Sequence, residues 1–487
     1  MNTHNKKLQG AAMSIPDSRG VSPYPLRQLS VALGLALCAV WSHAACDAAN
    51  PEPADAASLS ELVPFNPATS TEQQSVKATG QTQLAELVRA AVVHSAENRG
   101  AEHTRNAAQF DLEQTRAGRS PQAAVNASLG LGGASVGQTN YGGTSVNSVG
   151  LTLSAPLYDG GRLNALTSYR EGLLSASGAS VGSARERVVR EAVLTVLERN
   201  RYGLQLKVYQ QYVAKLACLT QSVEQIVQAD PGRASERVQA RKSLRQTEIA
   251  RDETQAAWRQ AESKLQQLLG SQVELWTAVG LPLIDLPSLE AVVEQAQASP
   301  EVRQLQQQAQ ALGHYARASA AEQAPQLRWQ AGVNSARQAS NTTTQSWNVG
   351  LALNYTLADG GGARAGTNAA QERAEAARNA WEQALQERSK QAAVHHDAAR
   401  SAYQRASHYA ELLRDSDTLR NATYTQWIKL GRRSLFDVIS AESEHYQMRL
   451  SYVNALHEGY SASAQLRNTG EGLLPWLAPE LVTYAPR

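Results

Sequence analysis

Two matching stretches decide the fold: Val149-Gly-Leu-Thr-Leu-Ser-Ala-Pro-Leu-Tyr-Asp-Gly-Gly161 and, 200 positions later, Val349-Gly-Leu-Ala-Leu-Asn-Tyr-Thr-Leu-Ala-Asp-Gly-Gly361. In both, apolar residues fill most odd positions and small or polar residues fill most even ones, so an extended chain has one apolar face. Nine alternating residues are about the length of a tilted strand that crosses a bilayer. The residues predicted to face lipid are Val149, Leu151, Leu153, Leu157, Val349, Leu351, Leu353 and Leu357.

Each of these strands is predicted to end in a turn, because glycine tolerates the positive φ that such a reversal often requires. A long proline-free stretch rich in Ala, Glu, Gln, Arg and Leu follows each turn, so the chain passes twice from a membrane strand into a long helix. The residues of the two strand-to-helix turns are Asp159, Gly160, Gly161, Asp359, Gly360 and Gly361.

The same order of elements is predicted twice along the chain: a helix, a β-hairpin and a long helical hairpin that turns at a tip. The first copy spans 82–285, with the β-hairpin at 121–157 and the tip near 230–236. The second copy spans 286–482, with the β-hairpin at 325–357 and the tip near 429–437. The polar residues 132–145 are expected to form the loop of the first hairpin.

The amino-terminal segment has the pattern of a secretory signal, which is predicted for residues 1–45 with translation starting either at Met1 or at Met13. Residues 46–81 are then expected to be a flexible lead-in. Cys46 is a candidate for lipidation, but His43 stands where lipoprotein signals have leucine. We therefore expect a mature chain that begins near residue 45 with a free amine.

The overall charge and hydropathy exclude some classes of protein. The formal net charge is +2, and without residues 1–45 the chain has 42 basic and 43 acidic side chains, so no nucleic-acid partner is implied. The sequence contains no run of 18 apolar residues, so no transmembrane helix is expected. The predicted class is a mixed α and β membrane protein.

The number of strands predicts an oligomer. Four strands cannot close a barrel, and an open sheet in lipid would leave backbone groups unsatisfied at a cost of several kcal/mol each. Three copies supply twelve strands, which is within the range of outer-membrane barrels. We therefore expect a homotrimer with a 12-stranded β-barrel that continues into a long periplasmic α-helical barrel.

Three stretches together resemble the TolC family of trimeric outer-membrane export ducts, over about residues 82–475. They are Leu157-Tyr-Asp-Gly-Gly-Arg162, Gly431-Arg-Arg-Ser-Leu-Phe-Asp-Val-Ile-Ser-Ala-Glu442 and Tyr446-Gln-Met-Arg-Leu-Ser-Tyr-Val-Asn-Ala455. The resemblance implies a location in the outer membrane, an extension into the periplasm, and no cofactor. It also implies three kinds of partner: further copies of the chain, a periplasmic adaptor and an inner-membrane pump. The likeness is greater to the type I secretion branch, in which the pump is an ABC transporter and the cargo is a haemolysin-like or cyclolysin-like toxin.

By the same resemblance, the two tips form the periplasmic gate and the adaptor-docking site, and Arg433 matches a basic residue that locks neighbouring protomers closed. Three alternatives stay open: Arg433 is a solvated charge, it pairs with Asp437 one helical turn on, or its acceptor is another acid. Ser440 and Val238 stand where some relatives have acids, and Glu442 and Glu236 lie nearby. The predicted tip residues are Gly232, Arg233, Gly431, Arg432, Arg433, Ser434 and Asp437.

Enzymatic readings find little support in the sequence. Ser461 stands where a zinc-protease motif beginning at His457-Glu458 would need its second histidine, and neither Asp-Gly-Gly turn continues into a P-loop. We expect no catalysis. An outlet for an RND-type multidrug pump is the alternative function. A coiled-coil surface protein is a weaker one, because it explains the helices and not the duplicated strands.

Overall fold

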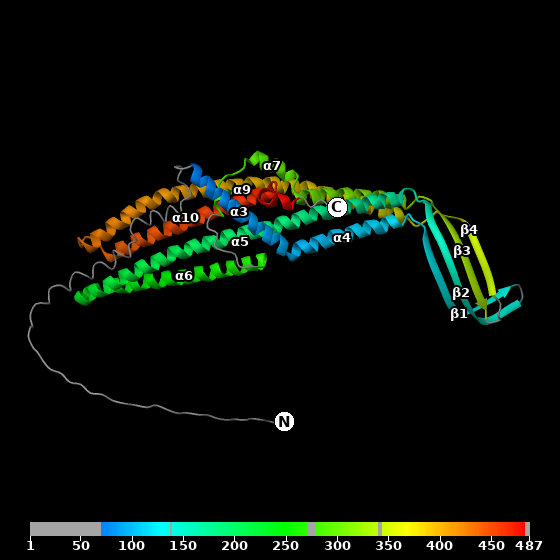
Figure 1. The fold of residues 1–487 in the computed structure, drawn as a ribbon, viewed down its shortest axis with the longest axis horizontal. Helices are drawn as coiled ribbons and strands as arrows, with labels where there is room; N and C mark the ends of the chain where they lie inside the picture. The colour runs from blue at the N-terminus through cyan, green and yellow to red at the C-terminus, as the bar shows by residue number, and fades with distance from the viewer. Residues whose placement is uncertain (1–69, 137–138, 271–278, 339–342, 483–487) are drawn as a thin grey trace, which may run out of the picture.

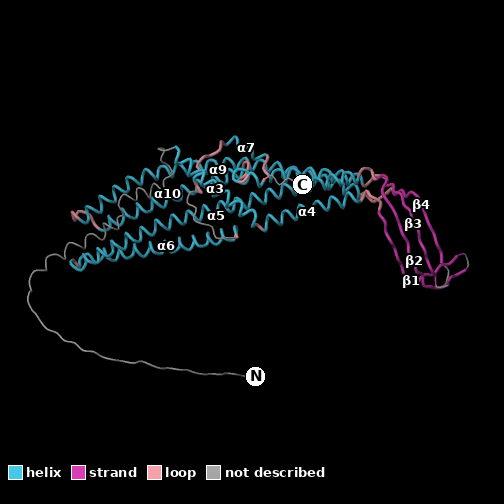
Figure 2. Tube along the Cα trace, viewed as in Figure 1, coloured by secondary structure: helices cyan, strands magenta, loops and turns pink. Residues whose placement is uncertain are grey.

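The computed structural model describes residues 70–136, 139–270, 279–338 and 343–482. The predicted signal peptide, Cys46 and most of the lead-in lie outside these ranges. The molecule is elongated, with the strands gathered at one end and the helices filling the rest of its length (Figure 2). In the described ranges, none of the helices combines the length and the apolar character that spanning a bilayer requires.

The helices follow one another in the same order in the two halves of the chain (Figure 1). In the first half they are α3 (Ser70–His94), α4 (Ala96–Ala117), α5 (Arg162–Ala229), the 3₁₀ turn η1 (Pro231–Arg233) and α6 (Ala234–Leu269). In the second half they are η2 (Leu281–Leu283), α7 (Leu289–Gln297), α8 (Pro300–Ala321), α9 (Gly362–Ile428), α10 (Leu435–Thr469), α11 (Leu473–Leu477) and η3 (Pro479–Leu481).

The first helix begins earlier than predicted. The lead-in was expected to extend to residue 81, but α3 begins at Ser70. Its sequence there is rich in Glu, Gln, Lys and Ala, which are good helix formers or tolerated in helices. Lys77 also forms an ion pair of 3.1 Å with Asp285, more than 200 residues away, and this contact holds the helix against the second half of the chain.

Four strands form one antiparallel sheet in the order β1 (Gln122–Val136), β2 (Thr139–Tyr158), β3 (Gln326–Gln338) and β4 (Thr343–Asn354). The loop predicted at 132–145 is wrong, because both strands continue through it until Val136 pairs with Thr139. Backbone hydrogen bonds between antiparallel strands do not require apolar side chains, so a polar segment extends the hairpin. Leu357 lies outside β4, which ends three residues before it.

The long helices set the length of the molecule. Helix α5 has 68 residues and spans about 100 Å, whereas α6 has 36 residues and spans about 55 Å. Helix α4 covers the part of α5 that α6 does not reach (Figure 1). Close to the strands, α4, α5, α8 and α9 contact one another in succession, and close to the tips the succession is α6, α5, α10 and α9.

The largest core cluster lies at the middle of the molecule, where the short helices cross the long ones. Leu84, Leu87 and Val88 of α3 pack there against Leu197 of α5. Tyr460 of α10 belongs to the same cluster, together with α11. These contacts join both halves of the chain, so the middle of the molecule is the part with the most complete apolar core.

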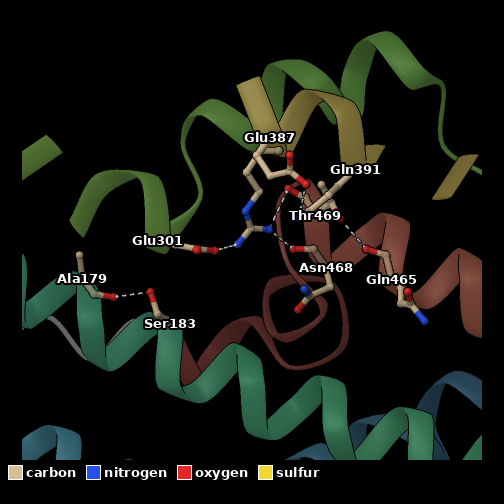
Figure 3. A network of polar contacts seen from close by, with 9 residues as sticks. Ala179, Ser183, Glu301, Glu387, Gln391, Gln465, Asn468 and Thr469 are labelled. Carbon is tan, nitrogen blue, oxygen red and sulfur yellow. Dashed lines mark hydrogen bonds and ion pairs between the residues drawn. The ribbon is translucent and has the colours of Figure 1, made fainter. Parts of the chain in front are cut away.

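Two side chains, Arg388 and Glu186, hold the turn between α10 and α11 from opposite sides. Arg388 of α9 forms an ion pair with Glu301 of α8 and donates to the carbonyls of Asn468 (3.3 Å) and Thr469 (3.5 Å) at the end of α10; Figure 3 shows this region. A cation at the carboxyl end of a helix is stabilised by the helix dipole. On the other side of the turn, Glu186 of α5 accepts hydrogen bonds from the backbone N–H groups of residues 473 (2.9 Å) and 474 (3.1 Å).

We expect the stability of this turn to depend on the protonation of Glu186. Burial raises the pKa of its carboxyl to about 7, against the opposing effects of two backbone N–H groups, Arg388 and Arg190. The ordinary value is 4.5, so the folded protein keeps a proton between about pH 4.5 and 7 that the unfolded chain loses, and stability falls as the pH rises through this window. The upper limit of the change is about 3 kcal/mol.

This dependence can be measured by hydrogen exchange of the Leu473 and Leu474 amides between pH 5 and pH 8, after correction for the intrinsic exchange rate. Protection should decrease toward pH 8 in the wild type. Glu186→Gln keeps an acceptor and removes the titration, so its corrected protection should be flat. Equal pH dependence in both proteins would contradict the assignment.

Candidate functional site: the strand face and the helical tips

The strand register places the apolar residues of all four strands on one face of the sheet. Residues directly opposite one another share a face, and Val125, Leu151, Val333 and Trp347 form such a row across β1, β2, β3 and β4. The next row on this face is Ala123, Leu153, Ala331 and Val349, and in the row after it Trp329 pairs with Leu351. The apolar face is therefore continuous across strands that are far apart in the sequence.

The other face of the sheet has small and polar residues. The row between the first two described above consists of Ala124, Thr152, Gly332 and Asn348. A sheet with one apolar face and one polar face has the pattern of a barrel wall between lipid and water. Six of the eight predicted lipid-facing residues lie within this regular register, namely Val149, Leu151, Leu153, Val349, Leu351 and Leu353.

Leu157 and Leu357 do not follow the same rule. Leu157 stands at a register shift between Pro156 and Tyr158, so its face does not follow from the alternation. Leu357 lies in the turn after β4 and is exposed. Sequence alternation missed both effects because neither a bulge nor the end of a strand changes the local pattern of residue types.

The two strand-to-helix turns have the same geometry. Oδ1 of Asp159 accepts from the N–H of Gly161 (3.1 Å) and its Oδ2 accepts from the N–H of Leu163 (2.7 Å). Asp359 accepts in the same way from Gly361 (2.9 Å) and from residue 363 (2.5 Å). All four glycines have positive φ, between 66° and 91°. Each aspartate satisfies free N–H groups at the start of a helix, so strand and long helix are joined in a fixed way.

The first tip lies between α5 and α6. Asp230 follows the last residue of α5, and its Oδ1 accepts from the N–H of Gly232 (3.1 Å). Arg233 pairs through two hydrogen bonds with Glu236, at 3.0 Å and 2.8 Å. A bidentate pair of this kind satisfies both groups locally, and Glu236 is accordingly occupied by its own tip.

The second tip turns at Gly431, whose φ of 61° is left-handed. The N–H of Arg432 donates to the carbonyl of Gln426 (3.1 Å), which closes the end of α9. Ser434 and Asp437 form a capping box at the start of α10: the N–H of Asp437 donates to Ser434 Oγ (3.2 Å), and the N–H of Ser434 donates to Asp437 Oδ2 (3.0 Å).

The suggested pairing of Arg433 with Asp437 inside one helix is wrong. Arg433 precedes the N-cap residue of α10, so the spacing of one helical turn does not apply to it. The hydrogen bonds of Ser434 lower the pKa of the Asp437 carboxyl, and the charge of Arg433 contributes least to this shift. Arg433 is exposed and donates from Nε to the neutral Oε1 of Gln426 (3.2 Å).

A buried cluster of charges near the tips was not found by sequence reasoning. Glu442 of α10 is fully buried, with its carboxylate 3.6 Å from Lys215 Nζ of α5 and 3.6 Å from an amino group of Arg420 of α9. Lys215 is also buried and lies over the ring of Tyr424 (4.5 Å). Glu442 therefore contacts two cations inside the protein and is unavailable as an exposed acid at the tip surface. The signal in the sequence is a charged residue among apolar ones at helical spacing: Lys215 lies between Tyr212 and Leu219, and Glu442 lies between Val438 and Tyr446.

Two histidines of α10 are buried and neutral. Burial, with the charges of Arg420 and Arg449, lowers the pKa of His445 to about 4, so the imidazole is neutral. His457 is likewise neutral, because burial lowers its pKa to about 3. Among the described residues, no group of three or more His, Cys, Asp or Glu side chains is placed to hold a metal ion.

A family profile with the description outer membrane efflux protein matches residues 87–271 and 292–469, which is more than half of the chain. The chain belongs to the outer membrane efflux protein family. The matched ranges contain the strand face, both turns and both tips. The protein is therefore located in the outer membrane and is an efflux channel of the tripartite kind, in which a channel works with a periplasmic adaptor and an inner-membrane pump.

Solved structures show the same fold. The CusC channel is 20% identical, with a TM-score of 0.70 over 80% of this chain and 92% of that chain. VceC from Vibrio cholerae is 16% identical, with a TM-score of 0.70 over 80% and 96%. The open state of the MtrE channel from Neisseria gonorrhoeae is 17% identical, with a TM-score of 0.67 over 80% and 89%. A comparison with curated proteins finds no match.

The assignment of the apolar face to lipid can be tested by matched arginine substitutions in this outer membrane efflux protein. Leu351→Arg or Leu353→Arg should cost about 2 to 4 kcal/mol near the bilayer midplane and reduce the amount of assembled channel. Thr152→Arg places the same charge on the opposite face and should be tolerated. Heat-modifiable migration of membrane fractions on gels measures assembly. If arginine on the two faces of the sheet reduced the assembled channel equally, or was tolerated equally, the assignment would be contradicted.

The gate role of Arg433 can be tested by conductance. If three tips converge to seal the tube, Arg433→Ser removes an exposed cation whose hydrogen-bond acceptor in the described part of its own chain is the neutral amide of Gln426. Single-channel conductance in planar bilayers should then rise. The expected contribution of each bond to a neighbour is about 0.5 to 1 kcal/mol. Arg378→Ser on α9, distant from the tip, is the control. Parent-like conductance of Arg433→Ser would make Arg433 an ordinary surface charge.

Proposed function

We propose that this outer membrane efflux protein is a homotrimer whose twelve strands close one β-barrel. Support comes from the two edge strands. Among the described residues, β1 pairs only with β2 and β4 pairs only with β3, so the outer edges of both strands have backbone groups without a neighbouring strand. These groups need partners in lipid. The two halves of the chain are proposed to be an internal repeat, which the matching turns at Asp159 and Asp359 support.

We further propose that the tips of the two helical hairpins form the gate and the adaptor-docking surface. The two tips lie at the same end of the molecule, opposite to the strands (Figure 1). Leu219 and Val227 of the first hairpin share a core cluster with Trp427, Leu435 and Val438 of the second. The tips of one chain are therefore packed as a unit, and a motion that opens the channel has to move this unit relative to its neighbours.

The proposed branch is type I secretion of a protein toxin, with an ABC transporter as the pump. The observation that carries this proposal is the resemblance to the TolC family, most of all in the stretch Gly431–Glu442 with its continuation to Ala455. This resemblance is closer to the type I secretion branch than to the lipidated multidrug branch. The stretch forms the second tip and about the first 60% of α10, so it would belong to the proposed adaptor-docking surface.

Deletion of the gene distinguishes the two candidate functions. Loss of one or a few secreted proteins, with unchanged antibiotic susceptibility, is expected for a type I secretion outlet. Complementation with the wild-type gene should restore secretion, whereas complementation with Leu351→Arg should not. Unchanged secretion together with increased susceptibility to several drugs would instead assign the protein to an RND-type multidrug pump.

A further inference from the structure

The contact between α5 and α10 holds the two helical hairpins of one chain together. Its apolar part includes Leu219 and Val438, which are each 1% exposed and belong to one cluster. Tyr212 stacks on Tyr446 next to them, with ring centroids 4.5 Å apart. Its charged part is the buried pair of Lys215 and Glu442 described above.

The repeat in the chain supplies the residues for a second contact of this kind, which a single chain does not form. Helices α5 and α9 follow Gly161 and Gly361, so a shift of 200 positions carries α5 onto α9. Helices α6 and α10 end at Gly270 and Gly470, so the same shift carries α6 onto α10. The counterpart of the α5–α10 contact would be a contact of α9 with α6. Within one chain these two helices lie at opposite edges of the layer of four helices (Figure 1).

Apolar residues stand at the counterpart positions and are exposed. Leu419 corresponds to Leu219 and is 54% exposed, and Val238 corresponds to Val438 and is 64% exposed. Leu412, at the position that corresponds to Tyr212, is also exposed. The two edges therefore present the halves of an apolar contact that a single chain does not make.

The charges at the counterpart positions have reversed signs. Asp415 of α9 stands where α5 has Lys215, and Lys242 of α6 stands where α10 has Glu442. Both are exposed, and within the described ranges neither has an ion-pair partner. A reversed pair at matching positions would be attractive as well, because each helix still meets the opposite charge.

From this complementarity we infer that α6 of one copy packs along α9 of a neighbouring copy, with Lys242 forming an ion pair with Asp415 of that neighbour. This inference rests on the proposed trimer and specifies its helical interface.

Charge reversal tests the pair in the full-length trimer in membrane fractions. Lys242→Glu alone and Asp415→Lys alone should each lower the temperature at which half of the SDS-resistant trimer dissociates. The double variant Lys242→Glu/Asp415→Lys should return this temperature to the wild-type value. The matched control is Lys242→Glu/Glu375→Lys, which has the same net charge and places the new lysine about 60 Å further along α9; it should stay destabilised.

Cysteine cross-linking gives a second readout that does not depend on tolerated charge reversal. Oxidised Lys242→Cys/Asp415→Cys should form covalent dimers and trimers, whereas each single substitution and the double substitution Lys242→Cys/Glu375→Cys should not. A wild-type trimer with neither rescue nor specific cross-linking would overturn the inference and leave the proposed trimer standing. A wild-type protein that is monomeric in the membrane would overturn both.

Discussion

The structure depends on one constraint: within the described part of a single chain, the backbone groups on the outer edges of β1 and β4 have no strand beside them. In water such edges are tolerated, but in lipid each unsatisfied N–H or C=O group costs several kcal/mol. The constraint explains why a four-stranded sheet with an apolar face and a polar face is stable only as part of a closed ring. In the proposed trimer, the interface between copies would therefore include the membrane region.

The layer of helices, like the sheet, has two outer edges, because the strands pass into the helices through rigid turns. Asp159 and Asp359 accept hydrogen bonds from the first free N–H groups of α5 and α9, so the position of each strand fixes the position of the helix that follows it. In the sheet the free edges are β1 and β4, and near the tips they are α6 and α9. One ring closure would satisfy all of these edges together.

Several charged groups of the tips are satisfied within the chain. Arg233 is paired with Glu236, and Asp437 is occupied by the N–H of Ser434. Glu442 is buried between two cations from other helices. The guanidinium of Arg433 is exposed and donates to the neutral amide of Gln426. In the proposed gate, its acidic partner would come from a neighbouring chain.

The sequence by itself determined which strand residues lie on the apolar face, both Asp-Gly-Gly turns and the positions of the two tips. These features depend on residues within a few positions of one another. Tertiary structure decided the rest. Strand pairing converted the expected loop at 132–145 into strand, a capping box took Asp437 away from Arg433, and packing of α5 against α10 buried Glu442 beside Lys215. Each of these outcomes depends on hydrogen bonds or burial between groups whose meeting residue types alone do not specify, and in two of them the groups are on separate elements.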